Sequence, residues 1–372
     1  MCNEPIIVQR NKDVEHIMHA SCYMGVDEQG RTKDKQFAML VTSDIHECPT
    51  QLSAAIDYLN YYEALDCGIC LGDIQQGNYA KTDGTWYYNA MSHTQKPFMS
   101  ILGNHDVGNT FDPALAGSPQ MAFDKFIRAT APLSGIENFD KPHFIKLFDQ
   151  YKIAIIGLNP YGDYPDLDEN GRLIKHTSTY SFMPEEVDWF IDALKSIPQG
   201  YHLTVAVHGF MYDADSIEGH WTDTNFSISA SHENAYGNDY MICDIIDAWI
   251  KGTSLVREYP GLADYLPTLS VNCDFSERGE GVFISYIVGH YHRDAIGRCR
   301  KYPDQKIICF PATANDRWQS CNHALPRQRG TKAEDAITVM SIVPAKRQVR
   351  LVRVGSNITI DFVERKYIII EY

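Results

Sequence analysis

Five short apolar runs stand out along the chain, and none of them alternates with polar residues. Runs of this length without alternation are typical of strands that are buried on both faces. Helix-like segments separate several of the runs, so strand and helix alternate as they do in α/β proteins. The strand-like runs are 37–41, 67–71, 97–102, 203–207 and 282–288, and the helix-like segments are 52–65, 120–130, 184–197 and 240–251.

The two ends of the chain follow other patterns. Residues 1–36 mix polar and apolar positions, and we expect an edge strand there. Basic and apolar residues nearly alternate over 346–353, which predicts a half-exposed antiparallel strand. Residues 335–372 are predicted to form a C-terminal group of strands, because they contain β-branched runs at 336–343, 348–354 and 366–372.

Residues 209–281 interrupt the alternation of strands and helices. The span is far longer than an ordinary loop, and it is rich in Asp, Asn, Ser, Gly and aromatic residues. We interpret 1–372 as a single domain in which 209–281 is an inserted lobe or lid near the active site that selects the substrate. An exposed elaboration that contacts no ligand is the alternative.

Each of the five central runs ends in a short polar block. Together the blocks offer two carboxylates, one carboxamide and four imidazoles, plus a further His–Asp pair. Because strand ends meet at one edge of a sheet, we expect the blocks to converge. Such ligands suit divalent ions such as Mn, Fe, Zn, Ni or Co, and two ions about 3.5–4 Å apart activate water for displacement at phosphorus. The blocks are Asp44-Ile45-His46, Gly72-Asp73, Gly103-Asn104-His105-Asp106, His208-Gly209 and Gly289-His290-Tyr291-His292.

The order Asp-x-His, Gly-Asp, Gly-Asn-His-Asp, His, Gly-His-x-His resembles the calcineurin-like metallophosphoesterase superfamily. All five blocks are present in order between residues 44 and 292, without a substituted ligand. The resemblance implies an α/β fold in which a two-sheet β-sandwich is flanked by helices in four αββα layers, with 335–372 as the C-terminal strands of the second sheet. His46 distinguishes the chain from the purple acid phosphatase branch, which lacks a His at this place.

The resemblance also implies a role for each residue of the blocks. Asp73 would bridge the two ions together with a hydroxide or water that acts as the nucleophile. His105 would face the leaving-group oxygen as a general acid or charge stabiliser, and Asp106 would orient His105 through a hydrogen bond. One ion would be held by Asp44, His46, Asp73 and His292, and the other by Asp73, Asn104, His208 and His290.

Further residues are candidates for substrate contact. Asn159 and Tyr161 follow a strand-like run, and His220 and Trp221 lie in the inserted lobe, where Trp221 would stack on a base or ring. Packing within a lid is the alternative role of the latter two. We expect residues 312–316 to form a solvated loop, with pocket lining as the alternative.

Composition narrows the classes of partner. The formal net charge of −15 over 372 residues disfavours non-specific binding to nucleic acid and to anionic membranes. No apolar run approaches the roughly 20 residues of a transmembrane helix, and no secretory signal is visible, so we expect a cytoplasmic protein. The ten Cys are scattered, and we expect Cys67 and Cys70 to be buried structural thiols.

The predicted function is therefore metal-dependent hydrolysis of a small phosphomonoester, phosphodiester or nucleotide. A nuclease, which would need a basic groove, and a phosphoprotein phosphatase are alternatives within the same class. A non-catalytic metal-binding scaffold is the alternative from a different class, but such scaffolds usually lose ligands and none is lost here. The natural substrate, the identity of the ions and the oligomeric state are left open.

Overall fold

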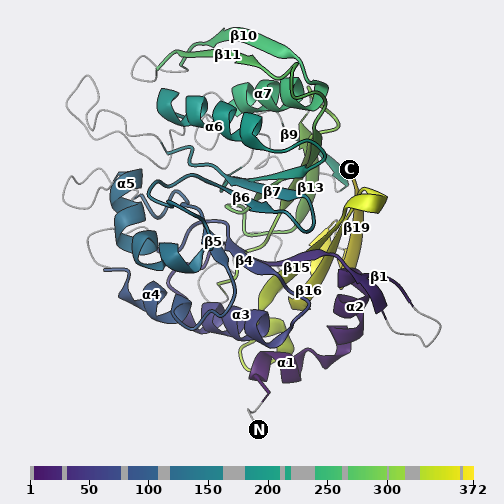
Figure 1. Cartoon of the computed structure of the whole chain (residues 1–372). Helices are drawn as coiled ribbons and strands as arrows, with labels where there is room; N and C mark the ends of the chain where they lie inside the picture. The colour runs from purple at the N-terminus through teal and green to yellow at the C-terminus, as the bar shows by residue number, and fades with distance from the viewer. Residues whose placement is uncertain are drawn as a thin grey trace.

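The computed structural model describes residues 4–26, 32–76, 83–107, 118–161, 181–209, 214–218, 239–261, 267–299, 301–314, 327–360 and 363–372. Two multi-stranded sheets occupy the middle of the molecule, and helices lie on the outer sides of both (Figure 1). The predicted α/β class, with two sheets between helices, is confirmed.

Seven strands form the first sheet. In spatial order they are β6 (Phe144–Phe148), β7 (Ile153–Gly157), β8 (His202–Ala206), β12 (Val282–Val288), β14 (Lys306–Cys309), β13 (Ala295–Cys299) and β9 (Ala214–Glu218). Strands β7, β8, β12 and β14 run parallel, while antiparallel β6 lies on one side of them and β13 and β9 on the other. The parallel strands are almost wholly buried, which explains their unbroken apolar sequences.

Six strands form the second sheet. In spatial order they are β19 (Tyr367–Glu371), β16 (Gln348–Gly355), β15 (Ala336–Val343), β3 (Phe37–Thr42), β4 (Cys67–Cys70) and β5 (Phe98–Ser100). Strands β3, β4 and β5 are parallel, and β15 joins β3 antiparallel at a register that pairs Met340 with Met39. Each sheet therefore has a parallel part whose strand ends are available for a site.

Helices connect and cover the strands. Between β3 and β4 runs α3 (Pro49–Tyr61), which starts with a proline at a position where no backbone N–H is needed. Helix α4 (Thr85–Met91) precedes β5, and α6 (Pro184–Ser196) precedes β8 with Glu185 and Glu186 in its first turn. The exposed Glu185 there complements the positive end of the helix dipole.

The segment predicted as a helix at 120–130 is less regular than expected. It divides into α5 (Pro119–Ala122), a π-helical turn over Phe123–Ile127 and a 3₁₀ helix over Arg128–Leu133. Pro132 lies inside the last of these pieces, and its ring is incompatible with a continuing α-helix. The prediction of helical structure was therefore correct, but the segment after α5 is not α-helical as expected.

The N-terminal region contains two helices that the sequence pattern did not predict. Helix α1 (Ile6–Arg10) is followed by α2 (Lys12–Cys22), and α2 packs against β15 and β16. Strands β1 (Tyr23–Val26) and β2 (Thr32–Lys35) pair with each other and not with the edge of a large sheet. A signal for α2 was present, because its buried residues Val14, Met18, Ser21 and Cys22 recur at helical spacing.

The span 209–281 has more regular structure than expected. The predicted helix is α7 (Asp239–Lys251), and the hairpin of β10 (Ser254–Tyr259) and β11 (Leu269–Asp274) follows it. The earlier strand β9 completes the first sheet beside β13, so part of this span belongs to the core of the fold. No helix within the described ranges is long and apolar enough to cross a bilayer.

Strand β16 is buried, although alternation over 346–353 predicted a half-exposed strand. Arg353 is 1% exposed; its Nε donates to Thr338 Oγ1 at 3.0 Å, and its guanidinium pairs with Asp294. Arg350 is also buried, and it donates to the backbone of α2 at Ala20. The prediction was wrong because the unforeseen helix α2 covers this part of the second sheet.

The Arg353–Asp294 pair generates a stability prediction. Arg353→Met keeps most of the side-chain volume but leaves the carboxylate of Asp294, whose side chain is 10% exposed, without its cation. We expect the free energy of unfolding to fall by about 3 kcal/mol or more. Lys346→Met removes an exposed charge from the turn before β16, and we expect it to change stability by less than about 0.5 kcal/mol. Chemical denaturation checks both variants, and equal losses would contradict a specific role for the buried pair.

Candidate metal centre

Nine polar side chains gather where strands of the two sheets end. Backbone hydrogen bonds between these ends fix their spacing: His46 N donates to Asp73 O at 3.0 Å, and Gly289 N donates to His208 O at 2.8 Å. The parallel strands therefore deliver the polar blocks to one place, as the sequence predicted. Asp44 and His46 follow β3, Asp73 follows β4, Asn104, His105 and Asp106 follow β5, His208 follows β8, and His290 and His292 follow β12.

The backbone at several of these residues is left-handed. Most residues other than glycine avoid a positive φ, because Cβ crowds the neighbouring carbonyl. Such a conformation persists only where the surrounding structure imposes it, and it is typical of functional sites. Of nine described non-glycine residues with a positive φ, five belong to the predicted ligand set: Asp44 (50°), His46 (47°), Asp73 (51°), His290 (67°) and His292 (56°).

Two glycines allow the strand ends to approach each other. A Cβ at Gly103 would lie 2.2 Å from Asp73 Oδ1, and a Cβ at Gly289 would lie 1.8 Å from Ser43 Oγ. Both distances are far below van der Waals contact, so a larger residue at either position would displace a ligand-bearing turn. Gly103 therefore brings β5 next to β4, and Gly289 brings the first sheet next to the second.

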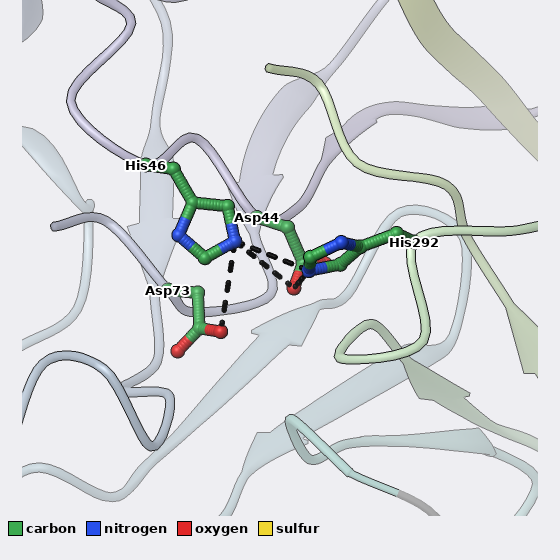
Figure 2. A group of neighbouring side chains, drawn as sticks. All are labelled: Asp44, His46, Asp73 and His292. Carbon is green, nitrogen blue, oxygen red and sulfur yellow. Dashed lines mark hydrogen bonds and ion pairs between the residues drawn. The ribbon is translucent and has the colours of Figure 1, made fainter. Parts of the chain in front are cut away.

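The first ligand group consists of Asp44, His46, Asp73 and His292, whose side chains point toward one another (Figure 2). His292 Nε2 lies 3.1 Å from Asp44 Oδ1 and 3.1 Å from His46 Nε2. The distance from His46 Nε2 to Asp73 Oδ2 is 3.9 Å. Donor atoms that share one ion at bond lengths near 2.1 Å lie roughly 3–3.5 Å apart when adjacent and about 4 Å apart when opposite each other, so this spacing suits a common cation.

The second group shares Asp73 with the first. His208 Nε2 lies 3.2 Å from Asp73 Oδ2 and 3.1 Å from Asn104 Oδ1. His290 Nδ1 lies 2.9 Å from the same Asn104 oxygen. Asp73, His208 and His290 form a second possible ligand cluster on their own, and the Asn104 carboxamide adds a fourth donor. Asp73 Oδ2 thus stands between the two groups.

One carboxylate oxygen of Asp44 and one of Asp73 are buried without a hydrogen-bond donor from any described residue. These atoms are Asp44 Oδ1 and Asp73 Oδ2. The opposite oxygens are satisfied, because Asp44 Oδ2 accepts from His290 N at 3.1 Å and Asp73 Oδ1 accepts from His105 N at 2.8 Å. An unsatisfied buried oxygen costs free energy unless a cation meets it. Two such atoms among imidazole nitrogens fit a divalent metal site.

The imidazoles are oriented by backbone carbonyls. His208 Nδ1 lies 2.6 Å from Leu71 O, and His46 Nδ1 lies 3.3 Å from Gln75 O. A carbonyl accepts only from N–H, so each Nδ1 carries a proton and each Nε2 is the nitrogen that faces the site. This arrangement is usual for metal-binding histidines.

The charges of the groups also suit a cation. Burial lowers the pKa of His46 to about 4 and that of His290 to about 3, so both are neutral. Burial opposes ionisation of Asp44, but His292 and His208 outweigh it and bring the pKa of Asp44 to about 2. Burial likewise lowers the pKa of His208, yet the carboxylates of Asp73 and Asp44 raise it to about 9. Before a cation binds, the site therefore holds two carboxylates, neutral imidazoles at His46 and His290, and a protonated His208 whose Nε2 proton a bound cation would displace.

The structure shows partners of Asp106 that the sequence did not predict. Its carboxylate accepts from Gln75 N at 2.9 Å and from Gly103 N at 2.8 Å. His105 Nδ1 lies 3.2 Å from Gln76 O, and its Nε2 lies 3.9 Å from Asp73 Oδ2. Asp106 thus ties together the turns after β4 and β5, while a backbone carbonyl orients His105.

Gln75 is a supporting residue that the sequence did not reveal. Its side-chain amide donates to the carbonyls of His105 and Asp106, both at 2.9 Å. No local pattern distinguishes this Gln from a surface residue, because its role depends on contacts with a distant turn. It fixes the loop on which His105 stands.

The other predicted contacts have mixed outcomes. Tyr161 is 1% exposed, and its ring lies 6.5 Å from that of His208 between centroids. Asn159 is 6% exposed, and its Oδ1 has no hydrogen-bond partner in the described part of the chain. Tyr161 therefore lies beside the second ligand group, and Asn159 is buried two residues earlier in the chain. His220 and Trp221 lie outside the described residues.

The loop after β14 is not the solvated loop we expected. Ala312, Thr313 and Ala314 are at most 4% exposed, and Thr313 N donates to Ser43 O at 2.7 Å. The prediction was wrong because this loop crosses to the second sheet, a contact between distant parts of the chain that leaves no local signal. Asn315 and Asp316 lie outside the described residues.

Fold and site together define an α/β protein with a buried Asp/His cluster that suits divalent metal. The family model described as calcineurin-like phosphoesterase matches residues 37–251, which is more than half of the chain. The chain belongs to this family and is a metallophosphoesterase, a hydrolase that acts on phosphoric ester bonds.

Several solved structures are similar to the chain at low sequence identity. No curated protein matches the chain. A protein of Thermus thermophilus has a TM-score of 0.38 at 9% identity, over 91% of this chain and 99% of that one. Phosphopantetheinyl hydrolase from Mycobacterium tuberculosis has a TM-score of 0.37 at 12% identity, over 74% of this chain and 90% of that one. A metallophosphoesterase from Sphaerobacter thermophilus has a TM-score of 0.32 at 12% identity, over 86% of this chain and 89% of that one.

Glu186, behind Asn159, generates a prediction on pH. Its Oε1 accepts from Asn159 N at 2.6 Å, and burial raises the pKa of Glu186 to about 8. Between its ordinary pKa and this value the folded state holds more protons than the unfolded state, so stability falls as pH rises. Glu186→Gln keeps the acceptor oxygen and removes the titration.

We expect the fall in stability between about pH 5 and about pH 8 to be smaller in Glu186→Gln than in the unchanged protein. The ratio of their unfolding equilibrium constants should shift by about tenfold or more over that range. Denaturant titrations at both pH values measure this. Glu185→Gln, in the same helical turn but exposed, is the matched control, and parallel pH profiles for all three proteins would refute the assignment.

Proposed function

We propose that the protein hydrolyses small phosphoesters with two divalent ions held between its two sheets. One observation carries the proposal: two ligand groups meet at Asp73, and the oxygen that faces both of them has no hydrogen-bond donor among the described residues. A carboxylate is the ligand best suited to bridging two cations. A dinuclear centre is the typical device for displacement at phosphorus.

The ligand geometry supports the division between the two ions. Ions bound here would activate water and stabilise the charge that develops on the phosphoryl group. The donor set of carboxylate, carboxamide and imidazole suits Mn, Fe, Zn, Ni or Co. One ion would be held by Asp44, His46, Asp73 and His292, and the other by Asp73, Asn104, His208 and His290.

His105 is the residue we assign to the leaving group. It stands outside both ligand groups, its side chain is 18% exposed, and its Nε2 faces Asp73 Oδ2. The Gln76 carbonyl holds the proton on Nδ1, so Nε2 is the atom directed toward the ligand groups. An imidazole in this position protonates or stabilises the departing oxygen.

A small phosphomonoester, phosphodiester or nucleotide is the substrate class that we favour. The net charge of −15 opposes the approach of long polyanions, which a nuclease must bind. We infer that Tyr161, whose ring lies beside that of His208, and Asn159, two residues earlier in the chain, contact a compact ligand. The inserted lobe at 209–281 is the proposed determinant of which ester enters.

Asp73→Asn tests the bridging role. The amide has the same shape but lacks the negative charge that two cations share, so hydrolysis of an aryl phosphate or diester should fall at least about a hundredfold. Asp57→Asn, on the exposed face of α3, should retain full activity. Initial rates with added metal measure both variants. Unchanged turnover in Asp73→Asn would sink the proposal.

His105→Asn tests the leaving-group role separately from metal binding. We expect kcat to fall by about 10²- to 10⁴-fold, while the number of ions bound stays the same. The loss should be smaller for aryl esters with acidic phenols, because such leaving groups need no proton. His93→Asn, an exposed histidine, is the control. A loss that is equal for acidic and weakly acidic phenols would contradict the assignment.

A panel of phosphoesters tests the substrate class. Aryl monoester, aryl diester, cyclic nucleotides, nucleotides and a phosphoprotein would each be tested with Mn, Zn and Fe supplied separately. Preferred turnover of small esters is the expected result. Preference for the phosphoprotein, or for single-stranded DNA added to the panel, would identify the corresponding alternative. Full metal occupancy without turnover of any ester would favour a non-catalytic scaffold.

A further inference from the structure

The loop after β14 joins the two sheets at the metal centre. Phe310 N donates to Val288 O at 2.9 Å, which extends β14 along β12 in the first sheet. A few residues later, Thr313 N donates to Ser43 O at 2.7 Å and Ala314 N donates to Asp44 O at 3.2 Å. The loop therefore pairs with the backbone just after β3 of the second sheet.

Thr313 adds a side-chain contact to this junction. Its hydroxyl oxygen accepts from Ser43 N at 3.1 Å, and the residue is fully buried. The side chain of Ser43 is in turn hydrogen-bonded to that of Asp44, since Ser43 Oγ donates to Asp44 Oδ2 at 2.5 Å. Thr313 thus holds both the N–H and the carbonyl of the residue that precedes the ligand Asp44.

Arg327 holds the other side of the loop. Its guanidinium donates to the carbonyl of Thr313 at 3.4 Å and to the carbonyl of Ala314. The N–H groups of the same two residues donate to the carbonyls of Ser43 and Asp44. A charged donor makes stronger hydrogen bonds than a neutral one, so Arg327 fixes the loop from behind.

Asp44 needs such support because its backbone φ is 50°. A non-glycine residue at this angle is strained by about 1–3 kcal/mol and relaxes to a negative φ when its surroundings allow. Relaxation would turn the Asp44 carboxylate away from His292 Nε2, now 3.1 Å from it. The contacts from Thr313 and Arg327 oppose that movement.

We propose that Thr313 and Arg327 are positioning residues that hold Asp44 in its ligand conformation and thereby set the affinity of the ion on the Asp44 side. The inference rests on the function proposed above. Neither residue belongs to the predicted ligand set. The ion held through Asn104 and His208 depends on them less, because its ligands come from other turns.

The test measures metal binding by the protein freed of metal, without any assay of turnover. Mn²⁺ is titrated into the full chain, and free Mn²⁺ is followed by electron paramagnetic resonance. Thr313→Val leaves Ser43 N–H buried without its acceptor, and we expect the affinity of one of the two sites to fall by about tenfold or more. Thr313→Ser keeps the hydroxyl and should restore it. Arg327→Gln should weaken the same site, and Arg327→Lys should weaken it less.

Two control variants separate positioning from general loss of structure. Thr130→Val removes a buried hydroxyl that donates to Ile127 O at 2.8 Å in a helix with no predicted ligand. Arg278→Gln removes a guanidinium that donates to Ile197 O at 3.1 Å and stacks on Trp249. Both should bind two ions with unchanged affinity. Circular dichroism and thermal unfolding show whether each variant is folded. If Thr313→Val does not fold, the affinities measured for Arg327→Gln decide the test.

Each outcome decides between the claims. Selective weakening of one site, reversed in Thr313→Ser and absent in the controls, supports the inference. Unchanged affinity at both sites in folded Thr313→Val, or equal weakening in Thr130→Val, overturns it while the proposed function stands. Failure of the unchanged protein to bind two ions overturns the dinuclear centre itself, and this inference with it.

Discussion

Two buried carboxylate oxygens, Asp44 Oδ1 and Asp73 Oδ2, lie among imidazole nitrogens without a hydrogen-bond donor from the described residues. Negative charge in a buried place is unfavourable unless a cation or a donor meets it. Here the carbonyl of Leu71 accepts a hydrogen bond from His208 Nδ1, and the carbonyl of Gln75 accepts one from His46 Nδ1. These hydrogen bonds direct Nε2 of both rings toward the site. The attraction between these inward-facing donors and a divalent cation is the interaction for which the strand ends are arranged.

The fold provides that arrangement at the junction of its two sheets. Parallel strands deliver ligands to one place, while Gly289 and the loop around Thr313 bring the second sheet into contact with the first. Left-handed backbone at five of the ligands shows that the junction imposes its geometry on the chain. Rigid ligands of this kind reduce the cost of reorganisation when an ion binds, which suits the proposed dinuclear centre.

Sequence patterns predicted the parts of the molecule that depend on local or strongly periodic signals. The buried strands, α6 and the polar blocks were all recognisable, because apolar runs and strand-end ligands leave clear traces. Contacts between distant segments were not recognisable. The burial of Arg350 depends on α2, and the roles of Thr313 and Asp106 depend on turns that only the folded chain brings together. Left-handed φ values were likewise hidden, because they arise from the junction and not from residue type.

The most direct test of the dinuclear centre is anomalous diffraction at the Mn absorption edge from crystals of the metal-loaded protein. The account predicts two anomalous peaks roughly 3.5–4 Å apart, with the Asp73 carboxylate between them. Asp44 and His292 should border one peak, and Asn104 and His208 the other. A single peak, or two peaks that do not share Asp73, would contradict the account.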